Sequence, residues 1–129
     1  LLSLDGRAAA TPAPAPLGVR LDRIRAGMKG VIDVGTAAGA FRAARFDTLR
    51  RGLSGKTGTA PTGPQGGADS ATVWFTGWLE PGSLPGQAHR LAIAAFVSHS
   101  EASGGEHAAP IVAAVLASAL AHNLEQKGK

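Results

Sequence analysis

The chain has 129 residues, of which 44% are hydrophobic and 17% charged, enough apolar material for one domain or part of a larger one. It contains no cysteine, which excludes a disulfide scaffold, a Cys-ligated zinc site and a thiol nucleophile. The net charge of +4 includes a cluster of four arginines, namely Arg42, Arg45, Arg50 and Arg51. Such a cluster is typical of a solvated basic face, and also of a surface that binds nucleic acid or anionic lipid.

The first half of the chain is predicted to hold a linker, one helix and an irregular stretch. Residues 1–16 end in alternating prolines, which is typical of an extended linker or loop. Residues 17–33 predict an amphipathic helix whose buried stripe is formed by Leu17, Leu21, Ile24, Met28 and Val31. Glycines then interrupt the pattern, and the chain up to Arg51 is expected to be irregular or in short helices.

The second half changes to strand-like patterns separated by turn residues. Strands are predicted at about residues 53–60, 72–79 and 90–98, and the last is apolar on both faces, as in a buried central strand. A closing helix is predicted over residues 108–126, with a wide apolar face formed by Ile111, Val112, Val115, Leu116, Leu120 and Leu124. Short connections favour an antiparallel sheet flanked by helices, that is, an α/β fold of the α+β type.

The motif Ser-Gly-Lys-Thr-Gly-Thr-Ala at residues 54–60 is the part of the sequence that indicates chemistry. A phosphate-binding P-loop would need a further glycine at the position of Arg50, and the motif would have to open a helix. Here the motif runs into Pro61 and a loop. Nucleotide binding is therefore excluded for this motif.

Read as a strand, the motif places Lys56 and Gly58 on one face, with Thr57 and Thr59 on the other. A bare backbone at Gly58 would let an extended substrate lie alongside an edge strand. The two hydroxyls could hold a carboxylate, the Lys56 ammonium would stabilise a nearby anion, and a backbone N–H at the strand's end could stabilise an oxyanion. These parts suit a peptide-like acyl donor with a terminal carboxylate.

The ordered motifs of the chain resemble those of the serine-active penicillin-binding proteins and β-lactamases. Lys56-Thr57-Gly58 is similar to the third signature of that family. Neighbouring segments resemble the surroundings of this signature in penicillin-binding transpeptidases: Gly27-Met28 with Val31, Gly35-Thr36-Ala37, Trp74-Phe75-Thr76-Gly77-Trp78, and Gly104-Gly105 with Ala108-Ala109-Pro110. The resemblance covers about residues 17–125 and concerns the C-terminal part of the transpeptidase domain.

The resemblance implies a D,D-transpeptidase that cross-links peptidoglycan stem peptides through an acyl-serine intermediate and is acylated by β-lactams. By the same resemblance, Lys56 would tune the site electrostatically and bridge to the second signature. Thr57 and Thr59 would bind the carboxylate of the donor or β-lactam, the Thr59 backbone N–H would serve the oxyanion hole, and Gly58 would leave room for substrate. No cofactor and no nucleic acid is implied. The implied location is periplasmic or extracytoplasmic, with a membrane anchor in a segment outside this chain.

Two further signatures of the family are missing from this sequence. No serine is followed by lysine three positions later, and none by asparagine two positions later, so the nucleophile and its base are not in this chain. Since a starting methionine and a signal segment are also missing, the chain is expected to be a fragment, inactive alone. Its expected partner is the upstream remainder of the same domain, whose strands would cover the strand at Leu91–Val97, because an open apolar edge invites aggregation.

The remaining polar and aromatic residues indicate no second site. No metal site is expected, because no two of the histidines are spaced like metal ligands, for example at positions i and i+4; these are His89, His99, His107 and His122. The triplet Ser98-His99-Ser100 places histidine next to serine. No Ser–His pair is expected within it, however, because immediate neighbours on a strand point to opposite faces. Trp74 and Trp78 share one strand face and are expected to pack in the core or in a groove.

Two alternatives stay open. A β-lactamase-type hydrolase fragment would share the fold, although class A β-lactamases deacylate with a glutamate upstream of the signature, and no glutamate precedes Lys56 here. A non-catalytic basic binding module would use the arginine cluster instead, and its affinity would fall steeply with salt.

Overall fold

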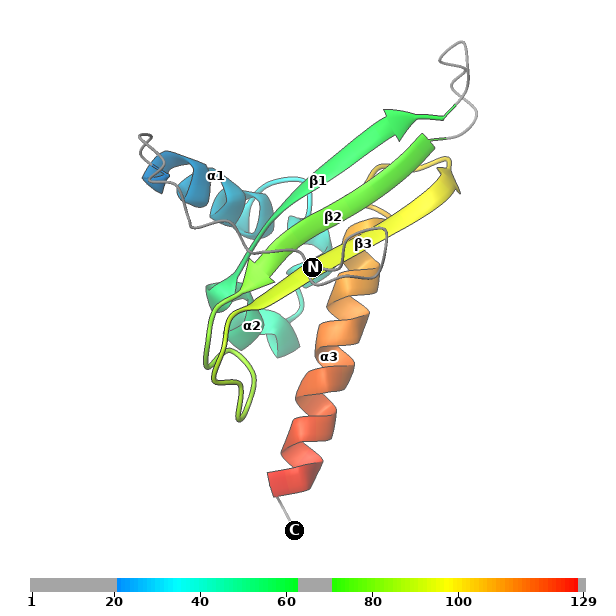
Figure 1. Cartoon of the computed structure of the whole chain (residues 1–129). Coiled ribbons are helices and arrows are strands. Elements are labelled where there is room, and N and C mark those ends of the chain that lie inside the picture. Colours follow the sequence, from blue (N-terminus) through cyan, green and yellow to red (C-terminus); the bar gives the residue numbers. More distant parts are fainter. Residues whose placement is uncertain (1–20, 63–70, 128–129) are drawn as a thin grey trace, which may run out of the picture.

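The computed structural model of the chain describes residues 21–62 and 71–127, with side chains up to residue 122. In chain order, its elements are α1 (Asp22–Asp33), the 3₁₀ segments η1 (Ala38–Phe41) and η2 (Ala44–Phe46), α2 (Asp47–Gly52), β1 (Leu53–Pro61), β2 (Ala71–Leu79), β3 (Leu91–Ser100) and α3 (Ala108–Lys127) (Figure 1). The linker predicted at residues 1–16 lies outside the described residues.

The three strands form one antiparallel sheet in the order β1-β2-β3. The register places Lys56 opposite Thr76 and Thr57 opposite Phe75, so the residues of the motif alternate between the two faces. In the described part of the chain, β1 and β3 each keep one edge that pairs with no strand. An α+β fold with an antiparallel sheet, as predicted, is therefore confirmed.

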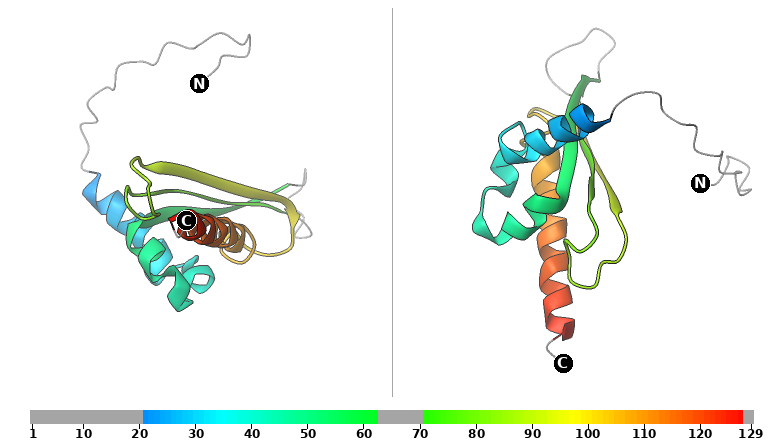
Figure 2. Two further views of the ribbon diagram at one scale, coloured as in Figure 1. Left: turned by 90° about the horizontal axis from the view of Figure 1, so that it is seen from below. Right: turned by 90° about the vertical axis from the view of Figure 1, so that its left-hand side faces the viewer.

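The helices gather on one side of the sheet, with α3 behind it and α1 beside β1 (Figure 2). Between them lies the hydrophobic core, in which Phe41 is fully buried. Its ring meets Phe46 edge-on at 5.7 Å between centroids and lies 6.3 Å from that of Phe75. Aromatic pairs of this kind add about 0.5–1.5 kcal/mol beyond area burial, so they anchor the irregular segment before α2 to the sheet.

The surroundings of β3 differ from the prediction. Its apolar pattern predicted a buried central strand, but β3 is an edge strand of the described sheet. Phe96 stands opposite Trp74 on the face away from the helices, where it is 76% exposed. The reason is that the core-forming helices pack against the opposite face of the sheet, so Phe96 is left uncovered.

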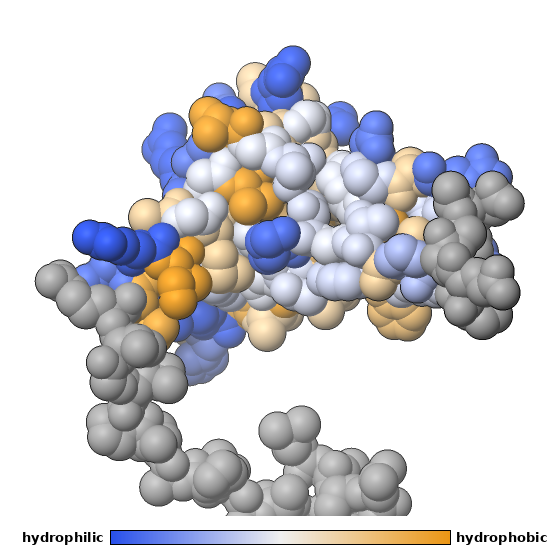
Figure 3. All heavy atoms as spheres, turned by 90° about the horizontal axis from the view of Figure 1, so that it is seen from above, coloured by the Kyte–Doolittle hydropathy of each residue, from blue (hydrophilic) through white to orange (hydrophobic). Residues whose placement is uncertain are grey.

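The buried side of α1 also differs from the predicted stripe. Ile32 is the residue that this helix buries, whereas Ile24 is 57% exposed. Leu21 and Met28 are half-buried and border an open groove of about 400 Å³ beside Trp78. Because the helix lies beside the sheet and not beneath it, only its last turn reaches the core. Apolar residues are accordingly exposed at the surface beside charged ones (Figure 3).

A polar cluster closes the turn that follows β2. Trp78 Nε1 donates to Glu80 Oε1 at 2.7 Å, and Arg90 donates to Glu80 Oε2 through Nη2 at 2.9 Å and Nε at 3.1 Å. The hydrogen bonds from Arg90 first, and from Trp78 second, lower the pKa of Glu80, because both favour the ionised carboxylate.

The free energy of unfolding should therefore depend on ionised Glu80. A carboxyl pKa that is lower in the folded state gives a contribution that is complete above the unfolded pKa and is lost as the pH falls through the folded one. We expect Glu80→Gln to reduce stability at neutral pH and to have no effect in strong acid, as measured by urea unfolding followed by tryptophan fluorescence. Glu101→Gln, at an exposed position, is the control. A Glu80→Gln effect of equal size at every pH would contradict this account.

Candidate active site

The site is built on β1, whose alternation separates the lysine from the threonines as predicted. Lys56 is exposed on the face away from the helices, and its ammonium donates to the carbonyl oxygen of Thr57. Thr57 is only 6% exposed on the opposite face, whereas Thr59, on that same face, is exposed. The positive charge and the two hydroxyls therefore flank one edge strand.

Thr57 is held by a residue to which the sequence assigned no role. Its hydroxyl lies 2.6 Å from that of Thr36, in the turn after α1. The turn is tight because the N–H of Gly35 donates to the carbonyl of Gly30, and a Cβ on Gly35 would lie 2.8 Å from the Cα of Val31. In the sequence, only the resemblance of the segment Gly35-Thr36-Ala37 to the family indicates that Thr36 belongs to the site.

The glycine loop before α3 packs against the same part of β1. The N–H of Gly104 points at Thr59 Oγ1 at 3.4 Å, and a Cβ on Gly104 would lie 2.7 Å from the carbonyl oxygen of Gly58. A Cβ on Gly105 would collide with the carbonyl oxygen of Thr36. Only glycine permits such close approach of backbones. The loop therefore joins the turn after α1 to β1.

Gly58 has a different neighbour from the one expected. Bare backbone at this position was predicted to leave room for a substrate. In the structure, Gly58 stands opposite Trp74, and a Cβ would collide with the indole ring. On this face of the sheet the space beside Gly58 is therefore filled by the half-buried Trp74.

A Ser–His contact occurs, although not within residues 98–100. Ser100 Oγ lies 2.7 Å from His107 Nδ1 across the loop before α3. Ser100 is 3% exposed, and its hydroxyl donates to the carbonyl of Ala102 at 2.9 Å while accepting from the Ala102 N–H at 3.1 Å. Because Ser100 is buried and also contacts both backbone groups of Ala102, the contact shapes the loop.

The four arginines of the basic cluster do not act as one surface. Arg42 and Arg51 are exposed, and Arg45 lies over the ring of Phe46, 4.9 Å from its centroid. Arg50 is half-buried within 4.0 Å of two aspartates. The basic-module alternative therefore lacks one uniformly exposed basic surface. Among the side chains described, in residues 21–62 and 71–122, no three of metal-ligating type come together.

A family model described as the penicillin binding protein transpeptidase domain matches residues 20–117, which is most of the chain. The match includes the turn after α1, the β1 motif, β2 and the glycine loop. No curated protein and no solved structure matches the chain. Domains of this family are typically extracytoplasmic, and none of the helices described above is long and apolar enough to cross a membrane. The chain belongs to the penicillin-binding protein transpeptidase domain family.

Proposed function

We propose that the chain is the C-terminal part of a peptidoglycan D,D-transpeptidase and that β1 binds the acyl donor. The observation that carries this proposal is the meeting of three separate segments at one end of β1. Thr36 contacts Thr57, and the glycine loop at Gly104 contacts Thr59. Family membership supports a penicillin-binding type of function, and this arrangement supports the finer assignment.

The chemistry proposed for β1 is recognition and charge stabilisation. The hydroxyls of Thr57 and Thr59 bind the terminal carboxylate of the donor, and Lys56 supplies a fixed positive charge beside it. A serine supplied from upstream attacks the penultimate D-alanyl carbonyl, the terminal D-alanine leaves, and an amine of a neighbouring stem resolves the acyl-enzyme. The Thr59 N–H is one of the proposed donors to the oxyanion of the tetrahedral intermediate.

Thr36 gives the Thr57 hydroxyl a direction. A hydroxyl carries one proton and accepts through two lone pairs. If the Thr36 hydroxyl donates across the 2.6 Å contact, Thr57 accepts there and its own proton is available for the carboxylate. Thr36 is therefore proposed as a positioning residue for substrate binding.

The proposed partner is the upstream remainder of the same domain, and two uncovered apolar surfaces support it. A groove of about 390 Å³ lies between β3 and α3, where Ile111 and Val115 are 45% and 62% exposed. The outer face of the sheet carries the exposed Phe96. Burial of apolar surface contributes about 25 cal/mol per Å², so covering both areas would stabilise the domain. We call this chain together with its upstream remainder the complete domain.

Fluorescent penicillin tests the proposed function. The complete domain, with its upstream Ser-x-x-Lys, is expected to form a stable covalent adduct, whereas this chain alone is expected to stay unlabelled. Rapid release of hydrolysed drug would favour the β-lactamase alternative. Absence of labelling in a folded complete domain would contradict the proposal.

Substitution of Thr36 tests the positioning role. Loss of one hydrogen bond is worth about 0.5–1.5 kcal/mol, so Thr36→Val should slow acylation about two- to tenfold. Thr36→Ser keeps the hydroxyl and should restore the rate. Thr48→Val, at an exposed position on α2, is the matched control and should change nothing. The measurement is the rate constant for labelling by fluorescent penicillin. An unaltered rate constant in Thr36→Val would show that Thr36 is not a positioning residue.

A further inference from the structure

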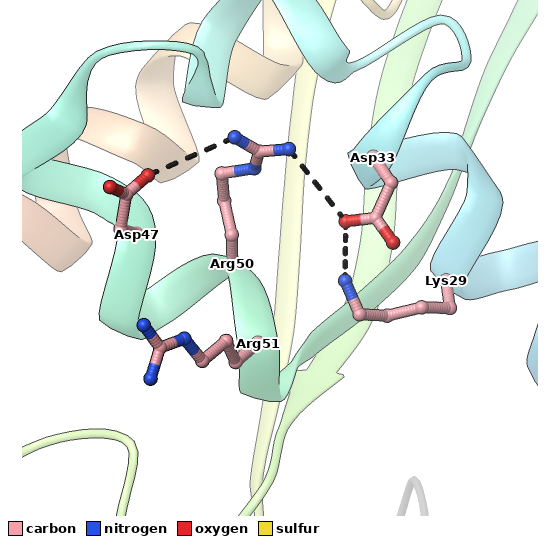
Figure 4. A pocket seen from close by; sticks show the side chains of 5 residues that line it. All are labelled: Lys29, Asp33, Asp47, Arg50 and Arg51. Atoms are coloured by element: carbon pink, nitrogen blue, oxygen red, sulfur yellow. Dashed lines mark hydrogen bonds and ion pairs between the residues drawn. The ribbon is translucent and has the colours of Figure 1, made fainter.

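A charged cavity of about 430 Å³ lies between α1 and α2 and shares no residue with the proposed acyl-donor site. α1 contributes Lys29 and Asp33 to its lining, and α2 contributes Asp47, Arg50 and Arg51 (Figure 4). Lys29 and Asp33 form an ion pair one helical turn apart. The other lining side chains are less completely paired.

Arg50 has donor capacity that its neighbours do not use. Its guanidinium lies between Asp33 and Asp47, as Figure 4 shows, but the shortest N–O distances are 4.0 and 3.9 Å. Both are too long for hydrogen bonds. Its buried Nε also has no hydrogen-bond partner among the described residues. The two carboxylates therefore orient the guanidinium electrostatically, and neither forms a hydrogen bond with its Nη atoms.

Arg51 adds a second guanidinium to the cavity. It extends from the last turn of α2 (Figure 4), is exposed, and has no ion pair or hydrogen bond within the described chain. The lining holds three cationic and two anionic side chains, so one positive charge is left over. That excess of positive charge favours an anion.

We propose that this cavity binds a small phosphate-class oxyanion, with Arg50 and Arg51 as the principal donors and Lys29 at the rim. Planar guanidinium groups match phosphate oxygens bidentately, which makes arginine better suited to this task than lysine. Asp33 and Asp47 can accept hydrogen bonds from a hydroxyl on the same ligand. The ligand class is thus a phosphate that carries a P–OH or an alcohol group, as in glycerol phosphate or in the headgroup of phosphatidylglycerol.

Calorimetric titration of the 129-residue chain with inorganic phosphate and with glycerol 1-phosphate tests this inference. We expect saturable binding with a Kd of about 1 mM, and a loss of about tenfold or more in Arg51→Ala. Chloride at matched ionic strength controls for screening. Arg42→Ala removes another exposed arginine outside the cavity and should keep the affinity. Penicillin labelling of the complete domain should be unchanged by Arg51→Ala, which shows that the variant folds.

Vesicles identify the source of the phosphate group. If phosphatidylglycerol vesicles bind, and binding is lost in Arg51→Ala and competed by glycerol 1-phosphate, the ligand is a lipid headgroup. Saturable binding of free phosphate without vesicle binding assigns a soluble anion. Equal losses in Arg51→Ala and Arg42→Ala, or no saturable binding up to about 10 mM phosphate, would overturn the proposal.

Discussion

Replacing Lys56 with alanine in the complete domain is expected to slow acylation by penicillin about 10- to 100-fold. Lys56 is exposed on a rigid strand, and its ammonium is held by the Thr57 carbonyl. The charge is therefore held at the backbone of Thr57, the residue whose hydroxyl, on the opposite face of the strand, is proposed to bind the β-lactam carboxylate. A hydrogen bond to a charged group is worth about 1.5–3 kcal/mol, which corresponds to this loss of rate. The second-order rate constant for labelling by fluorescent penicillin is the measurement.

Two further variants separate the local charge from a general effect. Lys56→Arg keeps the charge but replaces a compact ammonium with a planar group, so part of the rate should return. Arg42→Ala removes an equal exposed charge outside β1 and should leave the rate unchanged. Normal acylation of Lys56→Ala would remove the electrostatic role. An equal loss in Arg42→Ala would show that net charge matters and position does not.

The features of β1 that matter for the proposed site follow from local chemistry. Side chains alternate in any strand, so Lys56 and Thr57 had to lie on opposite faces whatever sheet they joined. Glycine- and proline-rich turns bound the strands, and the predicted strand ends consequently agree with the observed ones to within two residues. Local pattern is sufficient for properties of this kind.

Burial and long-range contacts could not be predicted from local patterns, because they depend on how the helices and strands are arranged in space. The apolar pattern of α1 is the same beside a sheet as beneath one, so periodicity alone could not show that Ile24 would be exposed. Likewise, the apolar pattern of β3 is typical of a central strand, and the described chain offers no neighbour for its outer edge. The contact between Thr36 and Thr57 joins residues 21 positions apart, a separation that no helical or strand period relates.

The close approach of β1 and β2 near the start of the motif depends on a pair of facing glycines. Gly77 stands opposite Gly55 in the register. A Cβ on Gly77 would collide with the carbonyl oxygen of Ser54 and would lie 2.8 Å from the Cα of Gly55. Both are backbone atoms, so no side-chain rotation can relieve the clash. Any larger residue at this position must push β1 away from β2.

Gly77→Ala is therefore expected to destabilise the fold by about 3 kcal/mol or more, at the upper end of overpacking costs. Gly27→Ala is the matched control, because Gly27 lies inside α1 with no atom within 4 Å of the added Cβ. There the same substitution should stabilise by about 0.5–1 kcal/mol, since alanine is the better helix former. Urea unfolding measures the change in the free energy of unfolding for both variants, and the two changes are expected to have opposite signs. A shift of β1 would also move Lys56 and Thr57, so Gly77→Ala should slow penicillin labelling of the complete domain, whereas Gly27→Ala should not. Similar small effects of the two substitutions on stability would contradict the close strand contact.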